Sequence, residues 1–443
     1  MKIAIPSHVS GRRVGVRGVH LQPSAYHTKW MEDHAYWIDL LVSMGMSWVV
    51  LINDGDSVLQ PNTDHCPLKV LLDAGIIPII REGGTLFPRS FEDHDTFLRT
   101  VELYDRYGLN PLWIIRNEPF DDREWANRKV PKDAWNIIMR VWSEAAQFIA
   151  TNGGIVGFPD GPCYDFNPFE SIKEYGLKWI FDQGLGFYAG HHYGKGRPLD
   201  YPTDPVSRLG IQLSMVDYET ALDDYANDPD WNEGPGVLAM MNAQRADPEW
   251  MAPGLTAIDD DTCWRGWEKI AHWSQQSFGY VVPMAMTEGG WVPRDRAGSG
   301  NNIDIRWPYT TPNEVAVKTL EMFETPSPLF AICPWLLADE DMGGSGWPFD
   351  AWHGWAHSER YGSKKPVIGV LQDHLPDDPP PEPPPPPVDP PPGDIEAALV
   401  LLFSSNELYE QAEMLREGAD TLAEQARQQQ AEAIALLFEM AEG

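Results

Sequence analysis

The sequence predicts an α/β protein built on a (β/α)8 TIM barrel. Eight short apolar runs lie between residues 14 and 335, and longer amphipathic segments separate most of them. This alternation is typical of a parallel sheet whose strands are joined by helices. Eight repeats favour a closed barrel over an open doubly wound sheet. No glycine-rich phosphate-binding loop follows any apolar run, which argues against a nucleotide-binding fold.

The apolar runs are expected to be strands because they are short, buried in character and bounded by turn residues. In chain order, the predicted strands are residues 14–20, 48–53, 76–81, 112–117, 155–158, 187–193, 281–288 and 329–335. The amphipathic segments between them predict helices at residues 32–44, 91–107, 134–150, 168–183, 264–277 and 312–323.

One connection, residues 194–258, is long, has no clear periodicity and is rich in Asp, Pro and Gly. A loop of this length in a compact domain is usually functional. Because it follows a barrel strand, it is expected over the carboxyl-terminal mouth of the barrel. There it would serve as a lid or a wall of a binding site, or form an accessory subdomain that does not touch the substrate.

The chain is predicted to have three parts. Residues 1–374 form the barrel domain, and residues 375–393 are a proline-rich linker of the kind that adopts a polyproline II spacer. Residues 394–443 are rich in the helix formers Ala, Glu, Gln and Leu. Leucines and alanines recur there at heptad spacing: Leu408, Leu415, Leu422, Ala412, Ala419 and Ala426. We therefore expect a coiled-coil-like tail that makes a homo-oligomer, or else a single helix docked on the barrel domain.

Composition limits the partners of the protein. The net charge of −33 argues against nucleic acid and anionic membranes and favours a neutral ligand, although an acidic surface can also serve solubility alone. The 19 tryptophans supply flat rings that can stack on sugars or pack in the core. The four cysteines have no zinc-site spacing, so no metal or cofactor is expected. We see no signal-peptide pattern and expect a soluble protein, in a location that the sequence does not reveal.

Two glutamates follow apolar runs that lie far apart in the sequence. Asn117 and Glu118 end the run at residues 112–116, and Glu288 ends the run at residues 281–287. Placing a carboxylate next to a buried strand costs free energy, so a functional role for it is expected. Because strands of a parallel barrel end at the same mouth, the two carboxylates are expected to meet in space. Paired carboxylates are the working groups of glycoside hydrolysis.

At this point the chain resembles the clan A retaining glycoside hydrolases, which are (β/α)8 barrels, and in style it is nearest to the cellulase-like family 5 enzymes. In that group strand four ends in Asn-Glu-Pro or Asn-Glu, and strand seven ends in a glutamate. Strand six often ends in His-x-Tyr and strand eight in a tryptophan. The matching segments here are Arg116-Asn117-Glu118-Pro119-Phe120, Met286-Thr287-Glu288-Gly289-Gly290-Trp291, His191-His192-Tyr193 and Cys333-Pro334-Trp335. The resemblance covers roughly residues 14–372.

The resemblance implies double displacement at a β-glycosidic bond of a neutral oligo- or polysaccharide. Glu118 would be the general acid and then the base, and Glu288 would be the nucleophile. Glu118 must be protonated and Glu288 ionised at the working pH. Arg81 and Tyr193 are candidates to hold Glu288 ionised, and Asn117 would donate to the sugar 2-hydroxyl. Carboxyl groups about 5–5.5 Å apart would indicate retention, and a separation beyond about 6.5 Å would indicate inversion.

Four further residues are expected near the substrate, each with core packing as the alternative: His20, His191, Trp291 and Trp335. The acidic run at residues 339–341 fits no calcium loop and is expected to be a solvated turn. A metal-dependent hydrolase would need His-x-His after the first strand, which Val19-His20-Leu21 lacks. The remaining alternative is a non-catalytic carbohydrate-binding barrel in a larger assembly.

Overall fold

The computed structural model describes most of the first 376 residues of the 443-residue chain. The described residues are 3–21, 34–60, 66–83, 85–160, 166–216, 235–248, 251, 254–260, 262–291, 304, 306–307, 310, 312–335, 337–339, 352–354 and 366–376. The chain divides into two units, Met1–Asp377 and Asp378–Gly443. Nearly all of the predicted linker and the whole predicted helical tail lie outside the described residues, so these parts and their self-association stay predictions.

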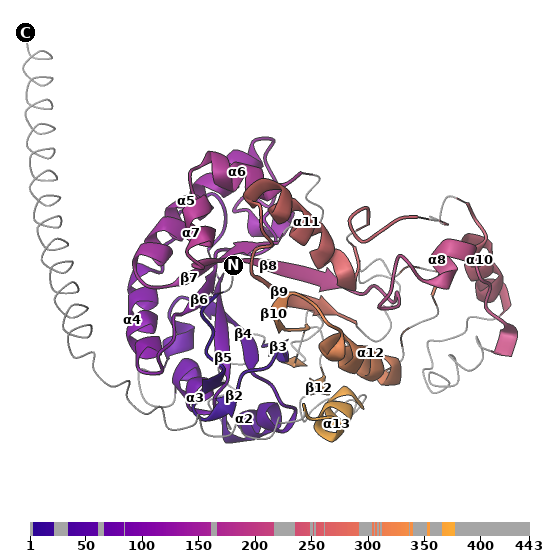
Figure 1. The fold of residues 1–443 in the computed structure, drawn as a ribbon, viewed down its shortest axis with the longest axis horizontal. Helices are drawn as coiled ribbons and strands as arrows, with labels where there is room; N and C mark the ends of the chain where they lie inside the picture. Colours follow the sequence, from indigo (N-terminus) through magenta and orange to yellow (C-terminus); the bar gives the residue numbers. More distant parts are fainter. Residues whose placement is uncertain are drawn as a thin grey trace, which may run out of the picture. The chain divides into compact units, whose positions relative to one another are not determined.

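Eight parallel strands form one sheet in which spatial order follows chain order, as a (β/α)8 barrel requires (Figure 1). The strands are β3 (Gly18–His20), β4 (Trp48–Asp54), β5 (Ile77–Gly83), β6 (Leu112–Ile114), β7 (Ile155–Pro159), β8 (Gly186–Tyr193), β9 (Met284–Gly290) and β10 (Leu329–Ile332). The first and last strands meet at a bridge between Arg17 and Ile332, and the amide of His20 donates to the carbonyl oxygen of Pro334 at 2.9 Å. These contacts close the sheet into a barrel.

The helices of the barrel lie outside the ring of strands (Figure 1). They are α2 (His34–Ser43), α3 (Pro67–Asp73), α4 (His94–Asp105), α5 (Ala134–Thr151), α6 (Pro168–Glu174), α7 (Lys178–Asp182), α11 (Trp267–Phe278), α12 (Pro312–Glu324) and α13 (Pro366–Asp373). Short 3-10 turns are η1 (Ser57–Leu59), η2 (Asp122–Glu124) and η3 (Trp264–Gly266). Two-residue strands pair outside the barrel: β1 (His8–Val9) with β2 (Arg12–Arg13), and β11 (Ala338–Asp339) with β12 (His353–Gly354). No described helix is long and apolar enough to cross a membrane.

The core forms because strands and helices bury apolar side chains against each other. Strands β4 and β5 pair over seven residues, from Trp48 with Ile77 to Asp54 with Gly83, and are buried on both faces at their starts. Helix α5 turns one apolar stripe inward, including Ile138, Trp142, Ala145 and Ile149 at helical spacing. Burial of this kind is worth roughly 1.5–3 kcal/mol for each large apolar side chain.

All eight predicted strands are confirmed, but two end early. Strand β6 stops at Ile114, since Arg116 has a positive φ of 68°, which a strand does not accommodate. Strand β10 stops at Ile332, two residues before Pro334. The helix predicted at residues 168–183 is instead two helices, α6 and α7, separated by Gly176 with a φ of 73°.

The long connection after β8 contains regular structure. It contains α8 (Pro205–Leu209) and α10 (Pro235–Arg245), which lie together to one side of the ring of helices in Figure 1. Helix α8 begins where Asp204 accepts hydrogen bonds from the amides of Val206 and Ser207, and it ends at Gly210 with a φ of 62°. Helix α8 has only five residues, too few to show a clear helical period in the sequence.

Candidate active site

Two glutamates and a histidine meet at the carboxyl-terminal mouth of the barrel. Glu288 lies in β9, and His191 lies opposite it in the register of β8 with β9. Glu118 lies in the loop after β6, four residues beyond the end of that strand. The Nδ1 atom of His191 is 3.1 Å from Oε1 of Glu118, and its Nε2 atom is 3.8 Å from Oε2 of Glu288. The imidazole therefore lies between the two carboxylates.

The separation of the carboxylates is small. One oxygen of Glu118, one oxygen of Glu288 and one nitrogen of His191 all lie within 4.8 Å of one another. A separation of about 5–5.5 Å between carboxyl groups is typical of sites in which one carboxylate attacks the sugar, and more than about 6.5 Å leaves room for a water molecule in between. The observed arrangement is close to the first case.

Glu288 is buried and held by a cation and a hydroxyl group. The Nη1 atom of Arg81, from β5, donates to its Oε2 at 2.9 Å, and the hydroxyl of Tyr193, from the end of β8, donates to its Oε1. Burial raises the pKa of Glu288, but the positive charges of His191 and Arg81 lower it by a larger amount, so the pKa is about 2. Glu288 is thus ionised at neutral pH, as a carboxylate nucleophile must be.

His191 carries a positive charge in this environment. Burial lowers its pKa, but the carboxylates of Glu288 and Glu118 raise it to about 9. Its backbone amide donates to Oδ2 of Asp160 at 2.6 Å, and Asp160 also accepts from the hydroxyl of Tyr188 at 2.6 Å. A protonated ring has N–H donors on both nitrogens, so His191 can donate to Glu118 while its charge faces Glu288.

A chain of hydrogen bonds runs from Glu288 to the loop after β6. The Nη1 atom of Arg81 donates to Oδ1 of Asn117 at 2.9 Å as well as to Glu288. The amide nitrogen of Asn117 then donates to Oε1 of Glu124, in η2, at 3.2 Å. Burial raises the pKa of Glu124. The sequence analysis did not select Glu124, because Asp122-Arg123-Glu124 has the composition of an ordinary polar turn.

The other predicted substrate residues occupy different positions. His20 in β3 is fully buried, and its ring lies 4.5 Å from that of Trp335. Burial, followed by the charge of Arg81, lowers the pKa of His20 well below its usual value. Trp291 is buried, and its indole N–H donates to the carbonyl oxygen of Arg197 at 2.8 Å. This geometry favours core packing for Trp291, and its predicted contact with substrate stays a prediction.

Gly289 and Gly290, which follow Glu288 at the end of β9, approach His192 and Pro334 closely. Gly289 has a φ of 129°, and a Cβ atom there would fall on the backbone carbonyl group of His192. Gly290 has a φ of 87°, and its Cβ would lie 3.0 Å from Cβ of Pro334. Since residues other than glycine are strained at such φ values, glycine is required here for both backbone and packing reasons.

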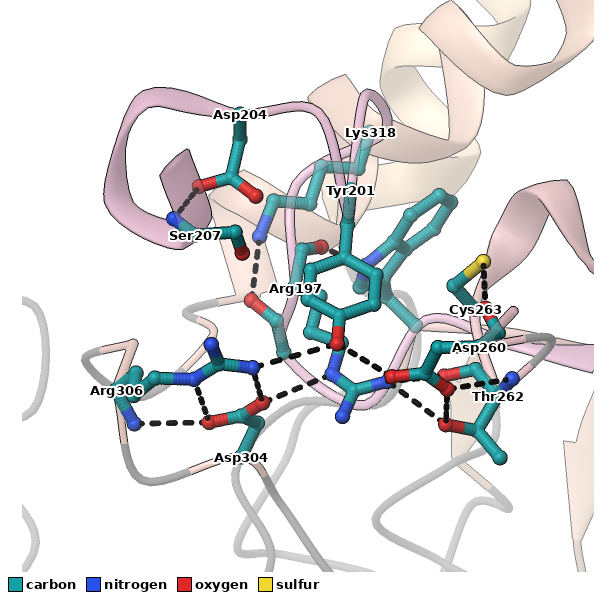
Figure 2. A network of polar contacts seen from close by, with 12 residues as sticks. Arg197, Tyr201, Asp204, Ser207, Asp260, Thr262, Cys263, Asp304, Arg306 and Lys318 are labelled. Atoms are coloured by element: carbon teal, nitrogen blue, oxygen red, sulfur yellow. Dashed lines mark hydrogen bonds and ion pairs between the residues drawn. The ribbon is translucent and has the colours of Figure 1, made fainter. Parts of the chain in front are cut away.

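A second buried polar group, which we call the loop ion cluster, joins the segments that follow β8 and β9 (Figure 2). It comprises Arg197, Tyr201, Asp260, Asp304 and Arg306. Nε of Arg197 donates to Asp304 at 2.9 Å, and Nε and Nη2 of Arg306 donate to the two oxygens of the same carboxylate at 2.9 and 2.6 Å. The hydroxyl of Tyr201 donates to Asp260, and the guanidinium of Arg197 lies 4.0 Å from the centroid of the Tyr201 ring.

The loop ion cluster has the properties of a structural element. Burial raises the pKa of both Asp260 and Asp304, but hydrogen bonds and the arginine charges lower it by a larger amount. The net effect is a lowered pKa, so both carboxylates remain ionised. Two carboxylates face two guanidinium groups, which balances the charge. The carbonyl oxygen of Arg197 also accepts from Trp291, which connects the cluster to the end of β9. It therefore fixes two loops beside the candidate site.

The group of Glu118, His191 and Glu288 also offers three ligand atoms that a metal ion could use. Zinc bonds of about 2.0–2.2 Å require ligand atoms roughly 3.5 Å apart, so these residues would have to move closer together. A guanidinium 2.9 Å from Glu288 would repel a cation at the same place. The geometry therefore favours proton transfer and nucleophilic attack over metal chemistry.

No protein-family model matches the chain, and no curated protein matches it. Among solved structures, it is similar to a β-glucuronidase from Bacteroides uniformis (14% identity, TM-score 0.41), covering 82% of this chain and 35% of that one. It is also similar to a β-glucosidase from Thermotoga maritima (11% identity, TM-score 0.39), covering 83% and 97%. The chain thus spans little more than a third of that β-glucuronidase. At such identities and scores the barrel assignment rests on the strand order, and the site on its own geometry.

Proposed function

We propose that the protein is a retaining glycoside hydrolase that cleaves β-glycosidic bonds of a neutral oligo- or polysaccharide. Glu118 is the general acid and base, and Glu288 is the nucleophile. The observation that carries the proposal is a buried, ionised Glu288 with one oxygen within 4.8 Å of an oxygen of Glu118, at the mouth of a parallel barrel. Arg81, Tyr193 and Asn117 support the pair through the hydrogen bonds described above.

The reaction proceeds in two displacements. The Glu288 carboxylate attacks the anomeric carbon while Glu118 donates a proton to the leaving oxygen, which breaks the glycosidic bond and forms a glycosyl ester. Glu118, now a carboxylate, then takes a proton from a water molecule, and the resulting hydroxide breaks the ester and releases the sugar. The nucleophile is restored, and the configuration at the anomeric carbon is retained after two inversions.

His191 has a defined part in this sequence. Its protonated ring lies 3.1 Å from Glu118 and can pass a proton to that carboxyl group as Glu118 protonates the leaving oxygen. After the first displacement His191 is neutral and Glu118 is a carboxylate. When Glu118 takes a proton from water in the second displacement, that proton returns to the imidazole. No proton is gained or lost over the cycle.

A neutral substrate fits the charge of the site and of the chain. The mouth carries Glu118, Glu124, Glu288 and Asp160 against the cations Arg81, His191 and Arg123, the last of which lies 3.6 Å from Glu118. The whole protein has a net charge of −33. A sugar that bears a carboxylate would be repelled by this field, so β-glucuronides should be poorer substrates than neutral β-glycosides.

The test is sugar release from neutral β-glucan, mannan, xylan and galactan and from aryl β-glycosides, with aryl β-glucuronides beside them. Wild type is compared with Glu288→Gln, Glu118→Gln and the surface control Glu144→Gln on α5. Wild type and the control should release sugar, and Glu288→Gln should be slower by roughly 10⁴- to 10⁶-fold. Equal rates for wild type and Glu288→Gln would remove that residue from the mechanism. Glycan binding without release by any variant would instead favour the carbohydrate-binding barrel.

The stereochemical outcome is a separate test. Proton NMR of the first product formed should show the β-anomer, which later equilibrates with the α-anomer. A 2-deoxy-2-fluoro glycoside with a good leaving group should label Glu288, as detected by peptide mass spectrometry. Initial formation of the α-anomer would refute double displacement.

A further inference from the structure

The residue directly before Asn117 and Glu118 has an unusual backbone conformation. Arg116 has a φ of 68°, in the left-handed region, and is almost completely buried. A residue with a long side chain is strained in such a conformation, which persists only when the surroundings enforce it. The surroundings of Arg116 should therefore explain why the chain turns at this point.

Three kinds of contact hold the Arg116 side chain. Its guanidinium pairs with Glu82 of β5, and both side chains are almost entirely inaccessible, at 1% and 0% exposed. Its Nη2 atom donates to the carbonyl oxygens of Arg89 and Ser90, at 2.8 and 3.1 Å. The guanidinium also lies 5.8 Å from the centroid of the Phe87 ring. Arg116 thus ties the loop after β6 to both β5 and the loop that follows it.

Strand β5 holds this loop with two consecutive residues. Successive side chains of a strand point to opposite faces. Arg81 contacts Glu288 and Asn117 at the mouth, whereas Glu82 pairs with Arg116 on the other face. Residues 81 and 82 therefore contact residues 117 and 116, respectively. The turn at Arg116 is thus fixed from both sides.

A buried ion pair is an expensive way to stabilise a protein, because desolvation often offsets the attraction, and apolar residues of similar size would serve as well. Burial raises the pKa of Glu82 to about 7, despite the opposing charge of Arg116. The nearby carboxylates Asp93 and Glu92 also raise it. A gain in stability therefore does not explain why this ion pair is present. Its effect on the backbone conformation of Arg116 does.

We propose that the Glu82–Arg116 ion pair positions the general acid. It holds Arg116 in the left-handed conformation, so that Glu118 reaches His191 and Glu288 while Asn117 reaches Arg81. Glu82 and Arg116 contact none of the reacting atoms and act through the loop that they fix. This inference rests on the proposed function, since it assigns the pair a role in delivering the proton of Glu118.

Leaving groups of different acidity provide the test. A displaced general acid slows substrates whose leaving group needs a proton, but hardly affects those whose leaving group departs as a stable anion. The full-length Glu82→Gln and Arg116→Gly variants are compared with wild type on aryl β-glycosides of increasing phenol pKa. We expect kcat/KM, which reports the first displacement, to fall roughly 10- to 100-fold for the poorest leaving groups and by less than about threefold for the best. Asp304→Asn, which breaks the loop ion cluster, serves as the matched control and should lower kcat/KM equally for all.

Glu118→Gln distinguishes the two proposals. It should show the same dependence on leaving group more strongly, and if it does not, the proposed function fails. If Glu118→Gln shows the dependence but folded Glu82→Gln and Arg116→Gly lower all rates equally or not at all, the positioning role is overturned. Removing one partner can unfold the protein, so the double variant Glu82→Leu/Arg116→Gly, which leaves no unpaired buried charge, is measured beside them.

The His191 ring gives a readout that needs no substrate. Its pKa is raised in part by Glu118, whose oxygen is 3.1 Å away. Displacement of Glu118 should therefore lower the His191 pKa in Glu82→Gln, as followed by NMR of the ring with His191→Gln used to assign the signal. An unchanged titration in the folded variant would contradict the proposal, whatever the rates.

Discussion

The candidate active site and the loop ion cluster are two largely buried groups of charges beside the ends of β8 and β9. They differ in the balance of positive and negative charge and in the pKa values of their members. The loop ion cluster matches two carboxylates with two guanidinium groups, and the pKa of both Asp260 and Asp304 is lowered. The candidate site has an excess of carboxylates. Its pKa values diverge, with Glu288 lowered to about 2 and His191 raised to about 9.

This difference separates stabilisation from chemistry. In the loop ion cluster each charge is neutralised by a neighbour, so proton transfer within the cluster is not favoured at neutral pH. In the candidate site one imidazolium lies between two carboxylates and can give its proton to only one of them. Titratable groups whose environments push their pKa values apart are typical of acid–base catalysis. The predictions below change one group at a time to test that distinction.

The largest effect is expected on stability from Asp304→Asn. The substitution leaves Arg197 and Arg306 buried without their shared carboxylate, which should lower the free energy of unfolding by about 3–5 kcal/mol. Because Asp304 contacts none of the groups assigned to catalysis, kcat of the folded variant should stay within about tenfold of wild type. Urea denaturation and initial rates measure the two quantities. A loss of activity as large as that of Glu288→Gln, in a stably folded Asp304→Asn, would remove the distinction.

A smaller effect is expected from the charge of His191. Its pKa in the folded protein, about 9, lies above the ordinary value of 6.5. The stabilisation it provides is therefore complete below pH 6.5 and is lost as pH rises through 9, and it amounts to at most about 3 kcal/mol. Denaturation of wild type and His191→Gln between pH 6 and 10 should show the difference in unfolding free energy shrinking as pH rises. A difference that stays constant with pH would show that His191 is neutral in the folded protein.

The two clusters each contain a tyrosine whose hydroxyl donates to a carboxylate, which gives a matched pair of variants. Tyr193→Phe removes the donor to Glu288, and a hydrogen bond to a charged group is worth about 1.5–3 kcal/mol. We expect kcat to fall roughly 10- to 100-fold. Tyr201→Phe removes the donor to Asp260 and should lower the free energy of unfolding by a comparable amount while leaving kcat nearly unchanged. The reverse pattern would show that the loop ion cluster takes part in catalysis.

Most of the barrel could be predicted from the sequence, because its strands are buried on both faces and therefore appear as short apolar runs. The early end of β6 could not, since Arg116 has a positive φ and its buried partner Glu82 lies 34 positions earlier in the chain. Helices α3 and α13 were also missed. Each has eight residues or fewer, too few to show the period of an amphipathic helix.

Part of the site was equally predictable. The residues at the ends of β5, β8 and β9 converge because parallel strands end at one mouth, and Arg81, His191, Tyr193 and Glu288 are brought together as the pattern indicated. Glu124 lies in a polar turn and gives no signal of its own. Trp291 follows Glu288 closely in sequence, but its indole is directed to Arg197. Strand alternation and loop contacts decide such orientations, and the order of residues alone does not reveal them.

The two glycines after Glu288 have a consequence for how relatives of this chain can be found. Every side chain is barred from Gly289 by the His192 backbone, and the φ of 87° at Gly290 disfavours every residue but glycine. Gly289 and Gly290 are therefore expected to be retained in relatives of this chain, because atomic overlap and backbone conformation exclude other residues there. A glycine pair at the end of the seventh barrel strand is thus a feature by which distant relatives can be sought.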